Sequence, residues 1–313
     1  MTRPRIFLDC DPGHDDAFAL LYAATTCELV GIGSVSGNVG VASTTRNALV
    51  VRDLAARTGD GVVVPVHRGA AGPLVGEPLH APDIHGESGL DGPELPTTVG
   101  DLDPLPAAQA IVRAARTHDD LWLVATGPLT NVALAIHLDP ELPRRLRGIV
   151  WMGGSRSFGN VTAAAEFNAL ADPEAADVVM RSGAHIVMVG LDLTHQFTLG
   201  PADTQRLRDA GTEAAAFCAD LLAFFQSRYG GASGRQDAPM HDPCTLLVLT
   251  DPSLIITEPH HVQVELRGTL TRGMTLCDRR DLHRRGPPNV EVATRIDADA
   301  ARERLHAALA SYR

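Results

Sequence analysis

The sequence predicts an α/β protein whose mainly parallel, doubly wound (Rossmann-like) sheet is flanked by helices. Short apolar runs typical of buried strands alternate with longer runs typical of helices along most of the 313 residues. Turn residues, as in Pro12-Gly13 and Gly37-Asn38, stand where strands should end. No stretch has the composition of a linker, so we expect one domain spanning residues 1–313.

Each expected element follows from its local pattern. Strands are expected at residues 6–8, 29–36, 61–66, 121–125, 148–152 and 185–192. Helices are expected from residue 15 to 23, from about residue 172, and at 43–58, 106–117, 202–210, 213–229 and 244–249. Glycine- and proline-rich residues predict a long functional or mobile loop at 69–104 and a hinge or loop at 230–234. Further strands are expected at 261–266, 269–277 and 290–295, before a closing helix at 297–311.

Charge and cysteine content disfavour several classes of function. The formal net charge is −11 and there is no run of Lys or Arg, so we expect neither nucleic acid nor an anionic membrane as a partner. The five cysteines are widely spaced without a CxxC pair, as expected for reduced core thiols. No apolar run approaches the roughly 18 to 20 residues of a membrane span. We therefore expect a cytoplasmic protein that binds a small neutral substrate.

Four carboxylates follow the first predicted strand within eight positions: Asp9, Asp11, Asp15 and Asp16. Taken singly, Asp15 could be a helix N-cap and Asp16 a first-turn acid, each worth about 0.5 to 1 kcal/mol. Taken together, clustered carboxylates without a cation would force some of the group to stay protonated. Oxygen ligands of this kind suit Ca²⁺ or Mg²⁺ and not zinc.

Other polar residues follow later strands, where the carboxyl ends of parallel strands form the ligand crevice. Thr126 follows one strand, and His241 with Asp242 precedes a short helix. The amides and carboxylate of Asn160, Glu166 and Asn168 match the needs of a polyhydroxylated ligand, although each alone is a common turn former. His85 lies in a Gly-flanked part of the long loop, where it is either a site residue on a closing segment or a surface histidine.

These stretches resemble the inosine-uridine nucleoside hydrolase family. The resemblance is carried by DCDPGHDDAFAL, GNVG, ATGPLTNVALA, WMGGS, GNVTAAAEFNALADPEAA and MHDP. It runs from residue 5 to about residue 250 and is weak beyond. It implies an enzyme that hydrolyses the N-glycosidic bond of ribonucleosides to ribose and a free base, with Ca²⁺ at the bottom of the site. It also implies a homotetramer or homodimer.

The resemblance implies roles for individual residues. The Ca²⁺ ligands would be Asp11, Asp16, the backbone carbonyl of Thr126, and Asp242. Asp11 would also be the base for the attacking water, and His241 matches the candidate acid for the leaving group. The remaining matches are to residues near the nucleoside: Asp15, Asn38, His85, Met152, Asn160, Glu166 and Asn168. Asp9 has no matched role and is expected to orient the loop or a ligand.

The base end of the site departs from the family pattern. Relatives carry tyrosines near the base where this chain has Phe224, Phe225 and Arg228, and only Tyr229 keeps a hydroxyl there. His241 is typical of pyrimidine-using or broad inosine–uridine members, whereas purine-specific members stack the base between tryptophans. We expect both tryptophans of this chain in core strands instead. The preferred base therefore stays open.

Three alternatives to a ribonucleoside hydrolase fit part of the same sequence. A haloacid-dehalogenase-like phosphatase would use Asp9-Cys-Asp11 as its DxD motif, but Pro12 does not fit and the chain has no lysine for the phosphate. A Ca²⁺-dependent ribose- or nucleoside-binding protein without turnover is disfavoured because Asp11 is intact. A hydrolase of a specialised ribosyl substrate is the third.

Overall fold

The computed structural model describes residues 3–97, 99–233, 236–280 and 286–313, and the side chains of 229–233 are left out. A nine-stranded sheet forms its centre. Its strands lie in the order β10 (Thr275–Asp278), β9 (Ile255–Val264), β11 (Val290–Ile296), β6 (Ile186–Val189), β5 (Gly148–Met152), β4 (Trp122–Ala125), β1 (Arg5–Cys10), β2 (Glu28–Ser34) and β3 (Val66–Arg68). A separate two-stranded sheet pairs β7 (Thr198–Leu199) with β8 (Ala238–Pro239).

Six strands in the order β3-β2-β1-β4-β5-β6 are parallel and form a Rossmann-type doubly wound sheet. β11 extends this sheet in parallel with β6, and β9 and β10 continue it as antiparallel strands. The predicted fold class is therefore confirmed. The strand order reverses between β1 and β4, which is the position where such sheets bind ligands.

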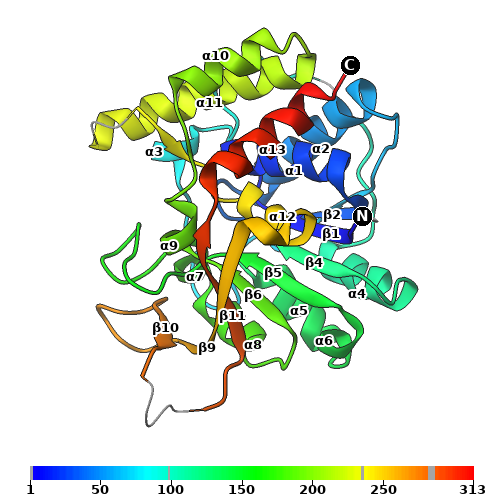
Figure 1. The fold of residues 1–313 in the computed structure, drawn as a ribbon. Helices are drawn as coiled ribbons and strands as arrows, with labels where there is room; N and C mark the ends of the chain where they lie inside the picture. The colour runs from blue at the N-terminus through cyan, green and yellow to red at the C-terminus, as the bar shows by residue number, and fades with distance from the viewer. Residues whose placement is uncertain (1–2, 98, 234–235, 281–285) are drawn as a thin grey trace.

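Helices cover both faces of the sheet (Figure 1). Since side chains alternate along a strand, Ile6 and Leu8 of β1 face one helical layer and Phe7 faces the other. The first layer contains α1 (His14–Thr26), α2 (Val41–Thr58), α11 (Glu213–Ser233), α12 (Pro243–Thr250) and α13 (Ala298–Ala310). The second contains α4 (Ala107–Thr117), α5 (Thr130–Leu138) and α8 (Pro173–Met180).

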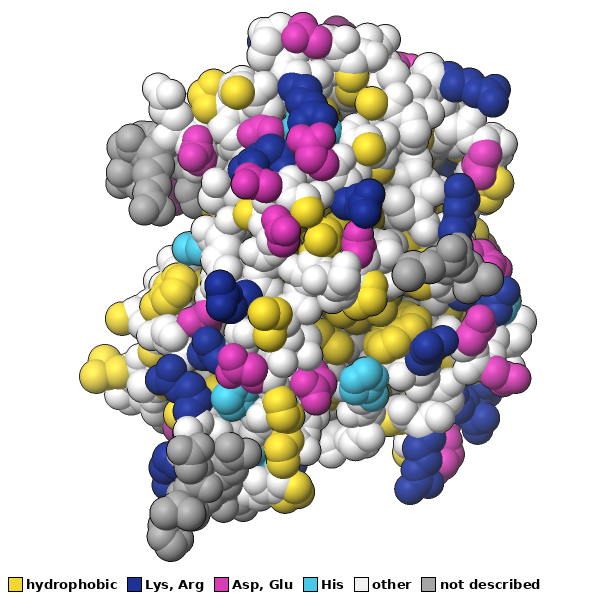
Figure 2. Space-filling model, in the orientation of Figure 1, with side chains coloured by type: hydrophobic (Ala, Val, Ile, Leu, Met, Phe, Trp, Pro, Cys, Tyr) yellow, Lys and Arg dark blue, Asp and Glu magenta, His cyan; other side chains and the backbone are white. Residues whose placement is uncertain are grey.

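The remaining helices are α3 (Pro82–His85), α6 (Leu142–Arg145), α7 (Phe167–Ala171), α9 (Leu191–Thr194), α10 (Pro201–Asp209) and a 3₁₀ turn at Pro252–Leu254. No helix among the described residues is long and apolar enough to cross a membrane. The visible face in Figure 2 carries arginines interspersed with acidic side chains instead of one basic patch. Both tryptophans lie in strands, as expected, with Trp122 in β4 and Trp151 fully buried in β5.

The largest departures from the predicted boundaries lie in three regions. The strand expected at 61–66 begins only at Val66, because the backbone pairs with β2 from there, and Val62 and Val63 are 58% and 64% exposed. Helix α11 continues through Gly230 and Gly231 to Ser233, so the expected hinge is helical up to the edge of the described residues. In the C-terminal region, β9 begins at Ile255 and β10 is shorter than expected, because most of residues 267–274 form turns.

Candidate active site

A cavity of about 310 Å³ opens at the carboxyl ends of the central strands. It brings together eleven predicted residues from separate parts of the chain: Asp11, Asp15, Asn38, His85, Thr126, Met152, Asn160, Glu166, Asn168, His241 and Asp242. Asp16 bonds to two of these lining residues, Thr126 and Asn38. Tyr229 was also predicted, but its side chain lies outside the described residues.

The acidic residues converge because β1 ends at Cys10 and α1 begins at His14, leaving a tight Asp-Pro-Gly turn between them. Asp16 closes this turn by accepting a hydrogen bond from the Gly13 amide at 3.0 Å. Its other carboxylate oxygen accepts from the Thr126 hydroxyl at 2.7 Å, which joins the turn to the end of β4. One carboxylate oxygen each from Asp15, Asp16 and Asp242 lie within 4.8 Å of one another, and all three residues are buried.

Burial makes the ionised form of these acids costly. It raises the pKa of Asp15 to about 7, with repulsion from Asp16 adding to the effect. Burial likewise raises the pKa values of Asp11, Asp16 and Asp242, and neighbouring carboxylates raise those of Asp11 and Asp242 further. Carboxylate-rich oxygen sites suit hard divalent cations, and a cation there would favour the ionised acids. The donor set therefore fits Ca²⁺.

Two asparagines hold the groups around this cluster. The Asn38 side-chain amide donates to the Asp11 carbonyl at 3.0 Å and to Asp16 at 3.2 Å, while its backbone amide donates to the Asp11 carboxylate at 2.7 Å. The Asn168 side-chain amide donates to two strand-end carbonyls, those of Thr126 at 2.8 Å and Met152 at 3.0 Å. Asn168 therefore fixes the Thr126 carbonyl and retains only its amide oxygen for a ligand.

The loop after β5 supplies Glu166 and Asn160. Glu166 is the N-cap of α7, where its carboxylate accepts hydrogen bonds from the amides of Gly154, Asn168 and Ala169 at 2.8 to 3.0 Å. Burial outweighs these bonds and raises its pKa to about 7. Asn160 is exposed at the cavity, and its side-chain oxygen accepts from the amide of Phe167 at 2.9 Å. Both side chains thus order the loop that carries them.

Two buried histidines line the cavity. His241 Nδ1 lies 2.8 Å from the Thr194 hydroxyl, and its ring contacts that of His195 at 5.6 Å between centroids. Burial lowers the pKa of His241 to about 3 and lowers that of His85 well below its usual value. Both imidazoles are therefore neutral near pH 7, and each can offer one N–H and one lone pair.

Asp9 lies behind the site. One carboxylate oxygen accepts from the Asn131 side-chain amide at 2.8 Å, and that same amide donates to the carbonyl of Ser34. The Asn131 oxygen in turn accepts from the amide of Ala70, at the start of the long loop. Asp9 thus belongs to a network that joins β1 to that loop.

Several lining residues were not predicted from the sequence, namely Ala81, Ile84, Val161, Phe167 and His195. His195 follows β6 by six residues, so its place after a strand was an available signal. Phe225 reaches the cavity from α11, in the stretch that the resemblance placed at the base end of the site. Its neighbour Phe224 lies under the guanidinium of Arg228, 4.9 Å from the ring centroid.

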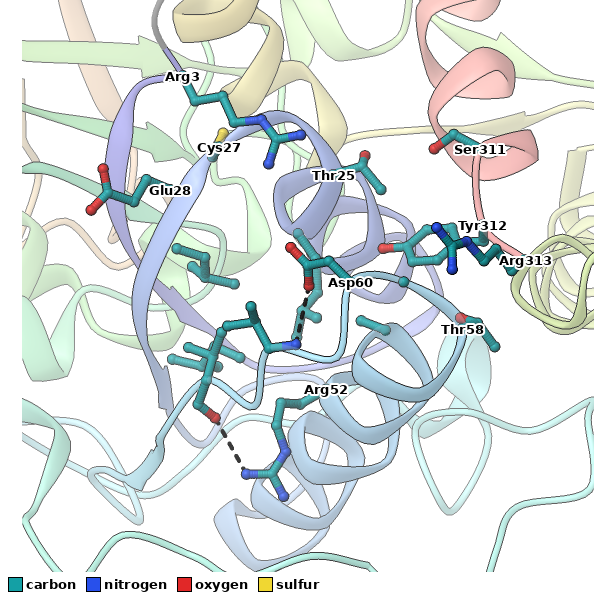
Figure 3. Close-up of a pocket in the computed structure, with 18 residues that line it drawn as sticks. Arg3, Thr25, Cys27, Glu28, Arg52, Thr58, Asp60, Ser311, Tyr312 and Arg313 are labelled. Carbon is teal, nitrogen blue, oxygen red and sulfur yellow. Dashed lines mark hydrogen bonds between the residues drawn. The ribbon is translucent and has the colours of Figure 1, made fainter.

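A second cavity, of about 640 Å³, lies at the opposite, N-terminal edge of the sheet (Figure 3). Aliphatic side chains such as Leu20 and Ile32 line it together with polar ones. Several of the polar groups are bonded to backbone: Arg52 donates to the carbonyl of Val64, and Tyr312 donates to that of Leu21. The buried acids lie at the other edge of the sheet, so the cavity there is the candidate active site.

A Rossmann-type sheet with a buried acidic cavity at its switch point is the arrangement of an α/β enzyme. The chain belongs to the inosine-uridine preferring nucleoside hydrolase family, whose sequence model matches residues 6–303. It is therefore an N-glycosyl hydrolase.

Relatives and solved structures agree with this membership. The chain is 42% identical over 311 residues to a pyrimidine-specific ribonucleoside hydrolase RihA of Enterobacter sp. (strain 638), covering 98% of each chain. It superimposes with a TM-score of 0.90 on the plant nucleoside hydrolase PpNRh1, at 30% identity over 98% of this chain and 99% of that one. The purine-preferring ribonucleoside hydrolase of Gardnerella vaginalis also gives 0.90, at 33% identity over 98% of both chains.

Proposed function

We propose that this protein hydrolyses the N-glycosidic bond of ribonucleosides of the pyrimidine or inosine–uridine type, in a Ca²⁺-dependent reaction that gives ribose and a free base. The observation that carries the proposal is the group of buried acids Asp11, Asp15, Asp16 and Asp242 beside the clamped Thr126 carbonyl. The RihA relatives, which are named as pyrimidine-specific, support the choice of base.

Asp11, Asp16, Asp242 and the Thr126 carbonyl would hold the Ca²⁺. A bound Ca²⁺ would supply the positive charge that keeps these acids ionised and would orient oxygen atoms of water and ribose. Mg²⁺ is the alternative ion for such oxygen ligands, and it would need a near-octahedral site. Metal replacement distinguishes the two ions. Asp15, whose carboxylate lies within 4.8 Å of those of Asp16 and Asp242, would bind a ribose hydroxyl.

Asp11 acts as the general base. Its backbone carbonyl and one carboxylate oxygen are held by Asn38, which restricts the carboxylate to one orientation. The other oxygen lies beside Gly127, where an added Cβ would come within 2.4 Å of it. An ionised Asp11 can take a proton from a water molecule that attacks the anomeric carbon, and general-base catalysis of this kind contributes about 10²- to 10⁴-fold.

The ribosyl group develops positive charge as the bond breaks, by analogy with O-glycosides. The buried acids provide negative potential at that point, which stabilises the transition state more than the neutral substrate. Asn160, Glu166 and Asn168 would contact the ribose with the lone pairs left by their bonds to the loop.

The leaving base must gain a proton or a hydrogen bond. His241 is neutral, so where the Thr194 hydroxyl donates to Nδ1, the hydrogen of His241 lies on Nε2 and can form a hydrogen bond to the leaving base. His85, Met152 and Phe225 complete the walls of the same cavity. The side chain of Tyr229, expected near the base, lies outside the described residues.

The test is ribose release from uridine, cytidine, inosine, adenosine and guanosine, with and without a strong Ca²⁺ chelator. We expect ribose from uridine, cytidine or inosine, and its loss on chelation with recovery on adding Ca²⁺. Recovery with Mg²⁺ alone would contradict the metal assignment. Tight Ca²⁺ binding without ribose from any of the five would favour the binding-protein alternative or a specialised ribosyl substrate. A single domain, a homodimer or homotetramer, and a cytoplasmic location stay predictions.

A further inference from the structure

The cavity of about 640 Å³ at the amino-terminal edge of the sheet has no part in the proposed hydrolysis. Its volume falls within the range of roughly 300 to 1,000 Å³ that small-molecule pockets occupy. Three elements give it an aliphatic inner wall, through Leu20 of α1, Ile32 of β2 and Ala55 of α2. These side chains are buried and belong to the core. A ligand in this cavity would therefore lie against preformed apolar surface.

Most polar side chains around the cavity already have partners within the protein. The hydroxyl groups of Thr25, Thr58 and Tyr312 donate to backbone carbonyls at 2.6 to 3.0 Å. The guanidinium of Arg52 is buried and donates to the carboxylate of Asp53 at 2.7 Å. Groups that are bonded in this way have little capacity left for a ligand, so polar recognition must come from the other lining residues.

Two lining side chains of opposite charge, Arg3 and Asp60, are available for a ligand. Both point into the cavity in Figure 3, whereas Glu28 points away and pairs with Arg5. Asp60 uses one carboxylate oxygen to accept from the amide of Val62 at 3.1 Å. Within the stretches that the structure describes, no hydrogen bond or ion pair engages its second oxygen or the guanidinium of Arg3.

The charges of Arg3 and Asp60 also act on buried residues of the cavity. Burial raises the pKa of the Cys27 thiol to about 11, and the charge of Arg3 opposes that rise. Burial also raises the pKa of Tyr312, and the carboxylate of Asp60 adds to the rise. Arg313, another exposed cation of the lining, would add to the attraction for an anionic group. The cavity thus combines an apolar wall with one acidic and one basic contact point.

We propose that this cavity is a binding site for a free α-amino acid with an aliphatic side chain, such as leucine. The carboxylate of the ligand would pair with Arg3, its ammonium group would pair with Asp60, and its side chain would lie against Leu20 and Ile32. A simple anion would leave Asp60 without a partner, and a simple cation would leave Arg3 without one, whereas a zwitterion satisfies both. This inference does not depend on the proposed hydrolase function.

The first test compares four small ligands on the native protein. The methyl signal of Ile32, assigned by its loss in Ile32→Val, should shift saturably when leucine is titrated in ¹³C-methyl NMR. Alanine lacks three carbon atoms of leucine, so its dissociation constant should be about 50-fold higher. 4-Methylpentanoate lacks the ammonium group and 3-methylbutylamine lacks the carboxylate, and each should bind about threefold more weakly than leucine.

Two results of this comparison would overturn the inference. An Ile32 signal that does not move up to the solubility limit of leucine would mean that the cavity binds no such ligand. If 4-methylpentanoate bound as tightly as leucine, the cavity would be a site for simple carboxylates. Both results are obtained without any variant of Arg3 or Asp60.

Two substitutions then test the charged contacts separately. Asp60→Asn keeps an oxygen for the amide of Val62 but removes the negative charge, so it should weaken leucine without weakening 4-methylpentanoate. Arg3→Gln should weaken leucine without weakening 3-methylbutylamine. Asp119→Asn and Arg295→Gln change exposed residues that do not line the cavity, and both should bind leucine as the native protein does. If Asp60→Asn and Arg3→Gln weakened every ligand alike, the assignment of the two charges would be wrong.

Binding at this cavity should not compete with the active site. Helix α1 presents Ala24, near its last residue, to this cavity and Asp15, in its first turn, to the active-site cavity. The dissociation constant of leucine should therefore be the same with chelator alone as with Ca²⁺ and excess uridine. Loss of the Ile32 shift on adding uridine would place leucine in the active site and overturn the inference. Because the measurement is of binding, a protein that binds leucine but hydrolyses no nucleoside would contradict only the proposed function.

Discussion

Replacing Asn168 by alanine tests whether the Thr126 carbonyl takes part in metal binding. The substitution removes two buried hydrogen bonds, from the Asn168 amide to the carbonyls of Thr126 and Met152. At about 0.5 to 1.5 kcal/mol each, the free energy of unfolding should fall by roughly 1 to 3 kcal/mol. Outer-shell partners of metal ligands are worth about 10- to 100-fold in metal affinity. We expect the Ca²⁺ concentration for half-maximal ribose release to rise by that factor.

The chain offers a matched control in Asn289. Its side-chain amide also donates to two backbone carbonyls, those of Met180 at 2.9 Å and Val262 at 3.0 Å, but it lies next to β11 and does not line the cavity. Asn289→Ala should therefore cost a similar free energy of unfolding, measured by urea denaturation with Ca²⁺ in excess. Its half-maximal Ca²⁺ concentration should match that of the native protein. If Asn168→Ala and Asn289→Ala required the same Ca²⁺ concentration, the proposed clamp on a metal ligand would be refuted.

Three further outcomes follow from the site. Burial raises the pKa of Glu166 to about 7 from 4.5, so protonated Glu166 favours the folded state. The metal-free protein should therefore be more stable below about pH 4.5 than above pH 7 by roughly 3 kcal/mol. Thermal melting in chelator should show this stability being lost as the pH rises through about 7. Asp11→Asn should keep the melting temperature of the metal-free protein, because the substitution removes a buried ionisable group. Its kcat should fall by at least about 10³-fold, and near-native turnover would exclude Asp11 as the base. His241→Ala should slow the hydrolysis of uridine about 10²-fold more than the hydrolysis of a nitrophenyl riboside. Thr194→Val should have an intermediate effect, because it removes the hydroxyl that contacts His241. Equal slowing of both substrates would assign His241 to binding.

Local sequence was enough to predict that the acidic residues would lie together at one end of the sheet. The turn between β1 and α1 is short, so Asp11, Asp15 and Asp16 lie close together in space for the same reason that they lie close together in the chain. Thr126 joins them because β1 and β4 are neighbours in register, with Asp9 opposite Ala125. The rule that parallel strands end at one edge of the sheet is sufficient to anticipate this contact.

Non-local contacts explain what the sequence did not predict. Val62 and Val63 have the composition of a buried strand, but both stay exposed, with Val62 lining the second cavity. The pairing of β3 with β2 begins only at Val66. Gly230 and Gly231 are weak helix formers that α11 nevertheless includes, which shows tertiary structure overriding local propensity. The Asn168 amide was expected on the ribose, and its use by two carbonyls depends on where the loop after β5 returns to β4.

The proposed base side of the cavity is assembled differently from the proposed sugar side. Ile84 and His85 come from α3 within the long loop, His195 from the segment after α9, and Phe225 from α11, whereas Asp11 and Thr126 directly follow central strands. Loops and helix ends can change without disturbing strand register, while the acids depend on that register. The same division explains how proteins named pyrimidine-specific and purine-preferring can both be similar to this chain over almost its whole length. If the proposed function holds, the choice of base can therefore diverge in this fold while the acids that would bind metal and ribose stay fixed.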